Sequence, residues 1–339
     1  MQLLLPLLFV ALTILAAVAP AVLYSLLIWW LDRYEKEPWG LLAATFVWGA
    51  IPAVCLALMG EFILEIPFSW VFGEAAGQVI GGSVVAPVVE EVVKGFAVFA
   101  VFLVFRREFD GLLDGIVYGA LVGFGFGMTE NAFYFLGGFL EGGAADWLLV
   151  VFLRTVIFGL NHGLFTAITG TGFGYASIAT SAWQRWLAPP VALGGSIVVH
   201  AVHNASTSLA ADLCWPVLIS LMNDWGGVLI ILVIVLLSWD RERSWIVREL
   251  DDEIRAGTIT KVEYEIVASY WRRIATQWKG LSRHGVQHAR RVRRLHQLAT
   301  ELAFRKHRLR GERDTRRSEE EVALLRGEIK ALKAQTTNW

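Results

Sequence analysis

Apolar runs long enough to cross a membrane recur along this chain of 339 residues, and they constrain its fold more than any other feature. A helix of ~18 or more apolar residues spans the ~30 Å hydrocarbon core of a bilayer. Hydrophobic residues make up 55% of the chain, more than in an average soluble domain. The sequence therefore predicts an all-α, polytopic transmembrane helical bundle. Seven spans are predicted, at residues 3–30, 40–62, 83–105, 113–138, 148–178, 188–210 and 214–238.

Charge divides the chain near residue 238. Residues 1–238 hold 7 Lys and Arg against 16 Asp and Glu, whereas residues 239–339 hold 23 against 15. We therefore expect two parts, a transmembrane domain at 1–238 and a basic, helical cytoplasmic tail at 239–339. The loops near 63–82, 139–147 and 211–213 contain no Lys or Arg, so the positive-inside rule predicts N-out/C-in topology in the plasma membrane. The basic loop residues on the predicted inner side are Arg33, Lys36, Arg106, Arg107 and Arg185.

Polar and ionisable residues gather at one predicted depth. At a rise of ~1.5 Å per residue, they lie ~10–20 Å below the outer surface, on four different spans. Charged groups in lipid are costly, so they normally face one another or a wet cavity. The sequence therefore predicts a shared polar site. Its members are Glu90, Glu91, Glu130, His162, His200, His203 and Asn204.

The segment Glu90-Glu91-Val-Val-Lys94 has two interpretations. Glu90 and Lys94, four residues apart on a helix, lie on one face and would form a structural ion pair. That pair leaves Glu91 unexplained. One of the two glutamates would then hold Lys94 while the other points into the cavity, and the spacing does not say which.

A ladder of four glycines runs along the fourth predicted span, at Gly115, Gly119, Gly123 and Gly127. Small residues at this spacing let a neighbouring helix backbone approach closely. The ladder predicts a helix-packing face. That face continues to Glu130 and Asn131, which it would bring against another helix.

The motifs and their order resemble the PrsW family of intramembrane proteases, within the wider CAAX-protease/bacteriocin-immunity superfamily. The resemblance covers about residues 30–240, and the tail is similar to the cytoplasmic extension of some members. Each motif is weak alone, but their order and common depth make the set specific. They are Glu90-Glu91-Val-Val-Lys94, Phe126-Gly-Met-Thr-Glu130-Asn131, Phe158-Gly-Leu-Asn-His162 and His200-Ala-Val-His-Asn204, with Asp32-Arg-Tyr-Glu-Lys-Glu-Pro38 and Asp114-Gly-Ile-Val-Tyr-Gly119 in support.

The resemblance implies an intramembrane endopeptidase that cleaves single-span membrane proteins, such as anti-sigma factors, near the outer face. Peptide hydrolysis needs an activated water and stabilisation of the oxyanion. We expect Glu90 to be the general base, with Glu91 and Lys94 beside it, although Glu91 remains an alternative. His162 would position the water or bind a metal, and His200 and Asn204 would bind the metal or donate to the oxyanion.

A zinc site needs three protein ligands and a water. His162 and His200 would supply two, with His203 or Glu130 as the third, but a metal-free Glu/His mechanism is equally compatible with the spacing. The only cysteines, Cys55 and Cys214, exclude a cysteine-type zinc site and a disulfide framework. His-Glu-x-x-His, Gly-x-Ser-x-Gly and Gly-x-Gly-Asp are absent, which argues against zincin, serine-hydrolase and presenilin-type chemistry.

Two other classes of protein remain as alternatives. Buried Glu, His and Lys also mark ion pathways, so a proton-coupled transporter or ion relay is one; inverted repeats would support it, and none is evident. The other is a catalytically silent scaffold on the same fold, which only an activity assay distinguishes.

The tail carries 12 Arg and Lys between Arg283 and Arg317, interleaved with apolar residues at helical spacing. We expect a solvated helical hairpin, with binding to anionic inner-leaflet lipid as the next interpretation. Nucleic acid is not expected as a partner, because no recognised motif accompanies the charge. A heptad-like run near the end would suit pairing with a partner helix. It consists of Val322, Leu325, Ile329 and Leu332.

Overall fold

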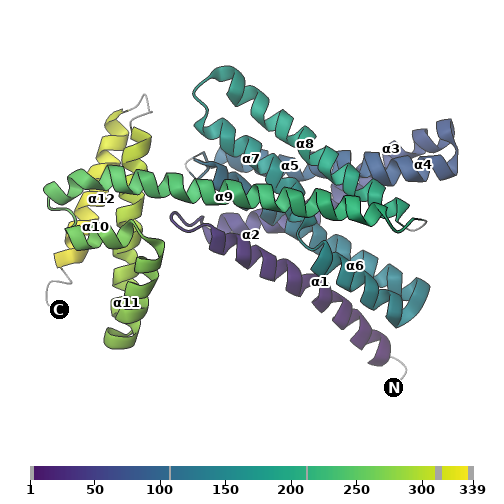
Figure 1. Cartoon of the computed structure of the whole chain (residues 1–339), viewed down its shortest axis with the longest axis horizontal. Helices are drawn as coiled ribbons and strands as arrows, with labels where there is room; N and C mark the ends of the chain where they lie inside the picture. Colours follow the sequence, from purple (N-terminus) through teal and green to yellow (C-terminus); the bar gives the residue numbers. More distant parts are fainter. Residues whose placement is uncertain (1–3, 107, 211–212, 310–314, 335–339) are drawn as a thin grey trace. The chain divides into compact units, whose positions relative to one another are not determined.

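The computed structural model describes residues 4–106, 108–210, 213–309 and 315–334, and within these ranges it contains helices and no strand (Figure 1). The chain forms two compact units. The first comprises Met1–Asp32 and Glu37–Val235, and the second comprises Arg33–Lys36 and Leu236–Trp339. The division near Val235 lies close to the boundary at residue 238 that the change in charge predicts.

The helices of the first unit are interrupted by short π-helical segments, and two of these segments precede helices that carry site residues. The segment η2 (Gly81–Val85) leads into α5, and η3 (Leu153–Ile157) precedes α7. Such π-helical turns are frequent at functional sites. The helices are α1 (Leu4–Leu31), α2 (Trp39–Trp48), η1 (Gly49–Ala53), α3 (Val54–Phe72), α4 (Glu74–Ile80), α5 (Ala86–Val104), α6 (Leu112–Phe152), α7 (Asn161–Ile178), α8 (Ala182–Leu209) and α9 (Pro216–Arg255), the last continuing into the second unit.

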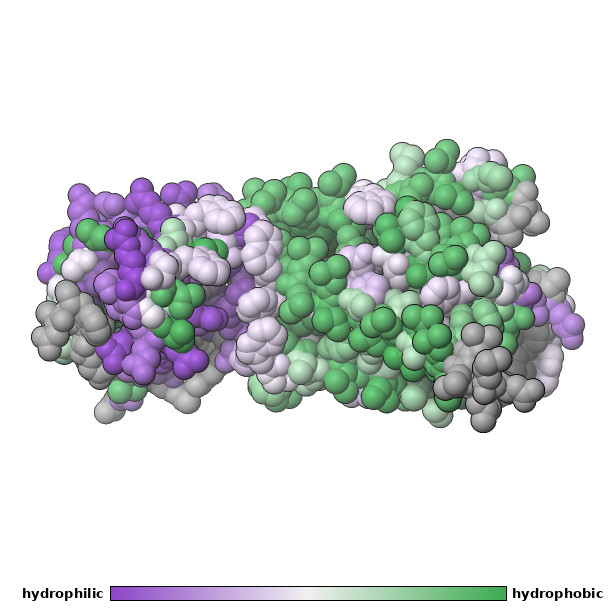
Figure 2. Space-filling view, turned by 90° about the horizontal axis from the view of Figure 1, so that it is seen from below, coloured by the Kyte–Doolittle hydropathy of each residue, from purple (hydrophilic) through white to green (hydrophobic). Residues whose placement is uncertain are grey.

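Five stretches among the described residues are long and apolar enough to cross a membrane. They are Leu7–Leu31, Trp39–Leu64, Leu112–Ile178, Ala182–Leu209 and Pro216–Arg255. The third of them contains two predicted spans, and α5, another predicted span, carries three charged residues. Hydrophobic side chains cover the visible face of the first unit, and hydrophilic ones cover most of the second (Figure 2). The predicted polytopic all-α bundle is confirmed; the span number and the orientation stay predictions.

Helix α6 reverses direction at Gly143. This residue has a φ of 74°, in the left-handed region that glycine adopts without steric cost. A methyl group placed on Gly138 would lie 3.3 Å from the side chain of Val150, although twelve residues of straight helix would span ~18 Å. The two arms of α6 therefore pack side by side around Gly143, which lies within the predicted loop at 139–147.

The glycine ladder of α6 packs against α7, as the spacing predicts. Any methyl group on Gly115 would overlap the backbone of Gly170, and one on Gly119 would overlap the backbone of Thr166. At Gly123 the same addition would overlap the carbonyl of His162. Because these glycines have no side chains, the backbones of α6 and α7 touch. This contact fixes the position of His162 along α6.

The second unit contains a helical hairpin with its own hydrophobic core. Helix α11 (Tyr270–Leu309) turns at Gly285, where φ is 82°, and α12 (Thr315–Ala334) packs against it. The heptad-like run of α12 contributes to this core, in which Ile329 is fully buried. The apolar face of α12 is therefore covered by other helices of the same chain. Helix α10 (Lys261–Val267) completes the unit, with a capping box between Thr260 and Glu263.

The loop between α1 and α2 belongs to the second unit. The Arg33 guanidinium lies 3.3 Å from the Trp239 ring centroid, and Tyr34 is buried in the same core. Glu35 forms an ion pair with Arg308 at 3.1 Å. Four residues of the motif Asp32-Arg-Tyr-Glu-Lys-Glu-Pro38 therefore pack with the tail, 200 and more residues later in the chain.

His296 in α11 makes the stability of the second unit depend on pH. Burial, with the nearby Arg273 guanidinium, lowers the pKa of His296 to about 4. The unfolded chain has a histidine pKa of ~6.5, so it binds a proton that the folded chain excludes. Stability is therefore full above pH ~6.5 and falls as the pH drops toward ~4, by about 3 kcal/mol in all.

We expect hydrogen–deuterium exchange of α11 amides, corrected for intrinsic rates, to show this loss of protection in the full chain between pH 7 and pH 4.5. His296→Gln removes the titrating group and should flatten the dependence. Equal pH dependence in both proteins would assign the effect to another residue.

Candidate active site

Glu91 has hydrogen-bond partners on both of its carboxylate oxygens. Its side chain has no solvent exposure, and its Oε1 lies 2.6 Å from Lys94 Nζ and 3.0 Å from His200 Nδ1. Its Oε2 accepts from Thr166 Oγ1 at 3.2 Å and lies 2.9 Å from Ser196 Oγ. Four side chains from α5, α7 and α8 thus converge on one carboxylate, which makes Glu91 an anchor that orients its neighbours.

Glu90, one residue earlier, has fewer partners. Its Oε2 accepts from Lys94 Nζ at 3.1 Å and lies 4.0 Å from His200 Nε2. Its side chain is 8% exposed, whereas that of Glu91 is fully buried. Glu90 is therefore the carboxylate with free hydrogen-bonding capacity, and the structure favours it over Glu91 as the group that can accept a proton from water.

Each of the two histidines of the site has one ring nitrogen bonded to a carboxylate. His162 Nε2 lies 2.5 Å from Glu130 Oε2, and His200 Nδ1 lies 3.0 Å from Glu91 Oε1. These hydrogen bonds assign the proton to the bonded nitrogen of each ring. The lone pair of His162 Nδ1 then faces Lys94 Nζ at 3.5 Å, and that of His200 Nε2 faces Glu90 Oε2 at 4.0 Å. Phe165 stacks on the His200 ring at a centroid distance of 4.4 Å and fixes its plane.

Lys94 uses all three of its N–H donors inside the site. Besides Glu90 and Glu91, its Nζ lies 3.5 Å from His162 Nδ1, and it sits 4.2 Å from the Phe126 ring centroid. The ion pair predicted from the Glu90–Lys94 spacing is therefore present, but it is one part of a larger cluster. The contact from Lys94 to His162 Nδ1 is the longest of the three. A bound cation would therefore replace Lys94 at His162 more easily than at either glutamate.

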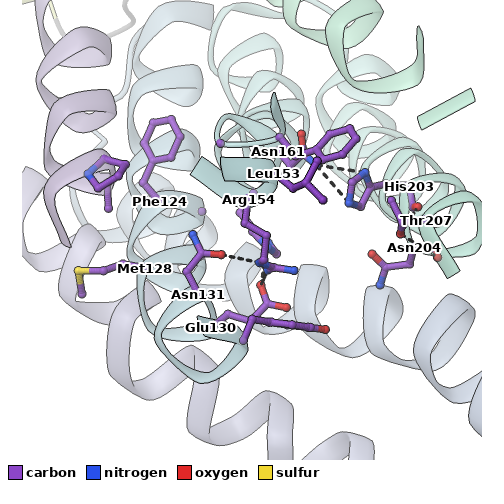
Figure 3. Close-up of a pocket in the computed structure, with 18 of the residues that line it drawn as sticks. Phe124, Met128, Glu130, Asn131, Leu153, Arg154, Asn161, His203, Asn204 and Thr207 are labelled. Atoms are coloured by element: carbon purple, nitrogen blue, oxygen red, sulfur yellow. Dashed lines mark hydrogen bonds and ion pairs between the residues drawn. The ribbon is translucent and has the colours of Figure 1, made fainter. Parts of the chain in front are cut away.

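Arg154 was not predicted as a site residue, yet it holds Glu130 and Asn131. Its Nη2 lies 2.8 Å from Glu130 Oε2, and its Nε donates to Asn131 Oδ1 at 2.6 Å (Figure 3). Its guanidinium stacks 3.8 Å from the Tyr134 ring centroid. An arginine deep in a predicted span was the signal that could have found it. The pairs Arg154–Glu130 and Glu130–His162 form a chain that orients His162.

The remaining predicted residues have other partners. Asn204 donates to the carbonyl of Gly82 at 2.9 Å and so ties α8 to η2. His203 Nδ1 lies 2.7 Å from Asp224 Oδ2, on α9. His203 is therefore engaged with α9 and does not join the cluster around Glu90.

A cavity of about 380 Å³ opens beside these groups. Its polar lining comes from α6, η3, α7 and α8, and in Figure 3 the side chains of Arg154, His203 and Asn204 lie around one space. An unwound peptide segment needs partners for its exposed backbone groups. The polar residues lining the cavity that would meet it are Glu130, Asn131, Arg154, Asn161, His162, His203, Asn204 and Thr207.

Among the described residues, Glu90, His162 and His200 form a group whose ligand atoms lie within 4.8 Å of one another. Two neutral imidazoles and a carboxylate are a donor set that suits Zn²⁺, and both histidines have the carboxylate partner typical of metal-binding histidines. The three carboxylates of the cluster face two cations, which leaves one negative charge for an ion or a proton to balance. The residues therefore fit a metal. The third donor in this group is Glu90, whereas Glu130 bonds to His162 from outside it.

Gly127 lies against the ring of His162 and allows a direct test of its placement. A methyl group there would lie 2.9 Å from His162 Cδ2, so the ring must move. We expect Gly127→Ala to lower turnover by ~10²-fold, the usual cost of a ~1 Å misplacement, with the protein still folded. Gly137→Ala, on the same helix with open space around it, is the control. Equal activity of both variants in a cleavage assay would mean that His162 need not be held where it is.

The sequence of this chain is similar to those of known proteins over much of the first unit. Residues 37–239 match the family described as PrsW family intramembrane metalloprotease. Protease PrsW of Geobacillus kaustophilus is 33% identical over 184 residues, 51% of this chain and 73% of that protein. Protease PrsW of Halalkalibacterium halodurans and of Bacillus subtilis are 24% and 26% identical over 56% and 51% of this chain, and over 80% and 72% of their own lengths. No solved structure gave a significant match. The chain is therefore an integral membrane protein and belongs to the PrsW family of intramembrane metalloproteases.

Proposed function

We propose that this protease hydrolyses a peptide bond of a membrane-embedded, single-span protein, with Glu90 accepting the proton of the attacking water. The observation that carries the proposal is the unequal bonding of the two glutamates: Glu91 has four partners, whereas Glu90 has one hydrogen bond and lies within 4.8 Å of a ring nitrogen of His162 and of His200. The family match favours this function over a transporter or ion relay. Intact acid–base groups argue against a silent scaffold.

Each group of the cluster has a role in this proposal. Glu130 and Arg154 hold His162, and Glu91 holds His200, so both rings keep their lone pairs toward the reacting water. Asn204 and Asn131 line the cavity, where their amides can donate to the carbonyl oxygen of the substrate. Lys94 compensates the charge of Glu90 and Glu91 and keeps the pair buried.

The same cluster would hold the metal implied by the family description, through Glu90, His162 and His200. Zn²⁺ bound there would supply a Lewis acid and lower the pKa of a bound water. Glu90 has two oxygens, so one can bind an ion while the other accepts a proton. Without a metal, Glu90 and the two histidines still provide a base and two polar partners for the water.

The proposed substrate is an anti-sigma-factor-like protein cleaved near the outer face. Support comes from the predicted depth of the site and from the polar cavity, which suits a locally unwound segment. The N-out/C-in topology in the plasma membrane, with a cytoplasmic tail, belongs to the same proposal.

Accessibility tags inserted after Gly77 and after Gly143 should report outside, and a carboxyl-terminal tag should report inside. A cytoplasmic signal at Gly143 would contradict the proposed depth.

The experiment is cleavage in proteoliposomes, with a library of single-span transmembrane peptides whose residues near the outer boundary are varied. Mass spectrometry identifies the fragments, with and without exhaustive chelation. Cleavage lost on chelation and restored by Zn²⁺ assigns the metal, and cleavage unaffected by chelation assigns the metal-free mechanism. No fragment under either condition would overturn the proposed function.

A further inference from the structure

A buried carboxylate on α9 is not used by the mechanism proposed above. Asp224 is 2% exposed and lies within an apolar helix long enough to span a membrane. An ionisable residue in such a helix is costly and normally faces a partner with a function. Its partner is His203, whose Nδ1 lies 2.7 Å from Asp224 Oδ2.

The contacts around this pair fix the orientation of the imidazole. Ser220 Oγ lies 2.7 Å from His203 Nδ1 and 3.5 Å from Asp224 Oδ2. Asn223 donates to Asp224 Oδ1 at 2.9 Å, which occupies the other carboxylate oxygen. The Asn161 amide nitrogen lies 3.1 and 3.3 Å from the two ring nitrogens. With Nδ1–H directed at Asp224, Nε2 of the neutral ring accepts from the Asn161 amide, and it must release this contact when it carries a second proton.

His203 and Glu130 line the same cavity (Figure 3). His162 lines it as well. It follows His200 by three residues on α8, so the two side chains share one helix face with Cβ atoms ~5–6 Å apart. The ring of Phe165 stacks on His200 and lies 5.9 Å from His203 between centroids. The cavity is therefore lined by His162, one of the three donors grouped with Glu90, and by a second, separately held imidazole on α8.

We propose that His203, held by Asp224, is the proton donor to the departing amine; this inference rests on the proposed peptidase function. Water forms the new C–O bond and gives its proton to Glu90. The C–N bond breaks, and the nitrogen takes the Nε2 proton of the His203 imidazolium. The proton on Glu90 then returns to His203 by exchange with water, so one water is consumed and both groups are restored. Asp224 is a positioning residue, which orients the ring.

The charged groups around His203 agree with this assignment. Asp224 faces it from α9, while Glu130, Arg154 and His162 line the cavity from α6, η3 and α7. The only carboxylate with a contact to the ring, among the described residues, is Asp224. The competing interpretation is that the pair merely joins α8 to α9, as Asn223 does through the Val199 carbonyl at 2.9 Å.

The test uses two versions of one substrate that the wild-type protein cleaves, one with an amide and one with an ester at the scissile position. An amine must be protonated to leave, whereas an alkoxide leaves more readily. His203→Gln should therefore lower amide cleavage by ~10²-fold, the scale for loss of a general acid, and ester cleavage by far less. A pair that only joins the helices would lower both equally.

Asp224→Asn should show the same amide-selective loss, smaller in size. The double variant should lose no more than His203→Gln alone, because Asp224 acts through His203. Trp225→Phe removes a neighbouring hydrogen bond of α9, to the Ile157 carbonyl at 3.2 Å, and should leave the amide-to-ester ratio unchanged. Thermal stability of each variant separates loss of folding from loss of chemistry.

The outcomes distinguish a failure of the proton-donor role from a failure of the proposed peptidase function. If the wild-type protein cleaves no member of the single-span peptide library, the proposed peptidase function fails. If it cleaves the amide, and His203→Gln lowers amide and ester cleavage by the same factor, the proton-donor role fails while the peptidase function stands.

Discussion

Replacing Glu90 by Gln should lower peptide cleavage by at least ~10²-fold, because the variant keeps the shape of the side chain and loses the base. The fold should survive, since Lys94 keeps its 2.6 Å contact with Glu91. Purified variant and wild-type protein are compared for cleavage of a verified substrate and for thermal stability in the same preparation.

Glu141→Gln is the matched control for Glu90→Gln. It removes the charge of an exposed carboxylate on α6, and we expect full activity. A Glu90→Gln protein that is stable and fully active would remove Glu90 from the mechanism. One that unfolds would instead support a purely structural ion pair with Lys94.

Replacing Glu91 by Gln should have the opposite signature, a loss of stability of ~3–5 kcal/mol, the cost of breaking a buried charge pair. The amide cannot balance Lys94, and its nitrogen cannot accept from Thr166 or Ser196, which lie 3.2 and 2.9 Å from Oε2. Thermal unfolding in detergent measures this loss. A Glu91→Gln protein as stable as wild type, but inactive, would exchange the roles assigned to the two glutamates.

The fold was predictable where local chemistry decides it. Apolar runs give the spanning helices, the loop around Gly143 without Lys or Arg gives the reversal in α6, and the spacing of Gly115 to Gly127 gives the close contact with α7. The tail hairpin follows from the alternation of basic and apolar residues. These features depend on residues near one another in the sequence.

The site was predictable only as a set of residues. The sequence brings Glu90, His162 and His200 to one depth, but the rotation of each helix decides which atoms meet. For that reason Glu90 appears as the third donor of the group, whereas His203 and Glu130 were the expected candidates. Arg154 and Asp224 were missed because each is a single charge in a span, with no motif to mark its partner.

The tail shows the same limit. The heptad-like run through Ile329 indicated a helix that needs a partner face, but not that the face lies within the chain. The burial of Tyr34 against that core depends on a contact across 200 and more residues, which spacing does not reveal.

The position of the cut is the most direct test of the central claim. Fragments of a single-span substrate, produced in proteoliposomes and measured by mass spectrometry, give the scissile bond to the residue. The account predicts two fragments that together exceed the substrate by one water, a cut inside the membrane segment near its outer end, and no fragments from Glu90→Gln. A cut in a soluble loop, or the same cut made by Glu90→Gln, would contradict it.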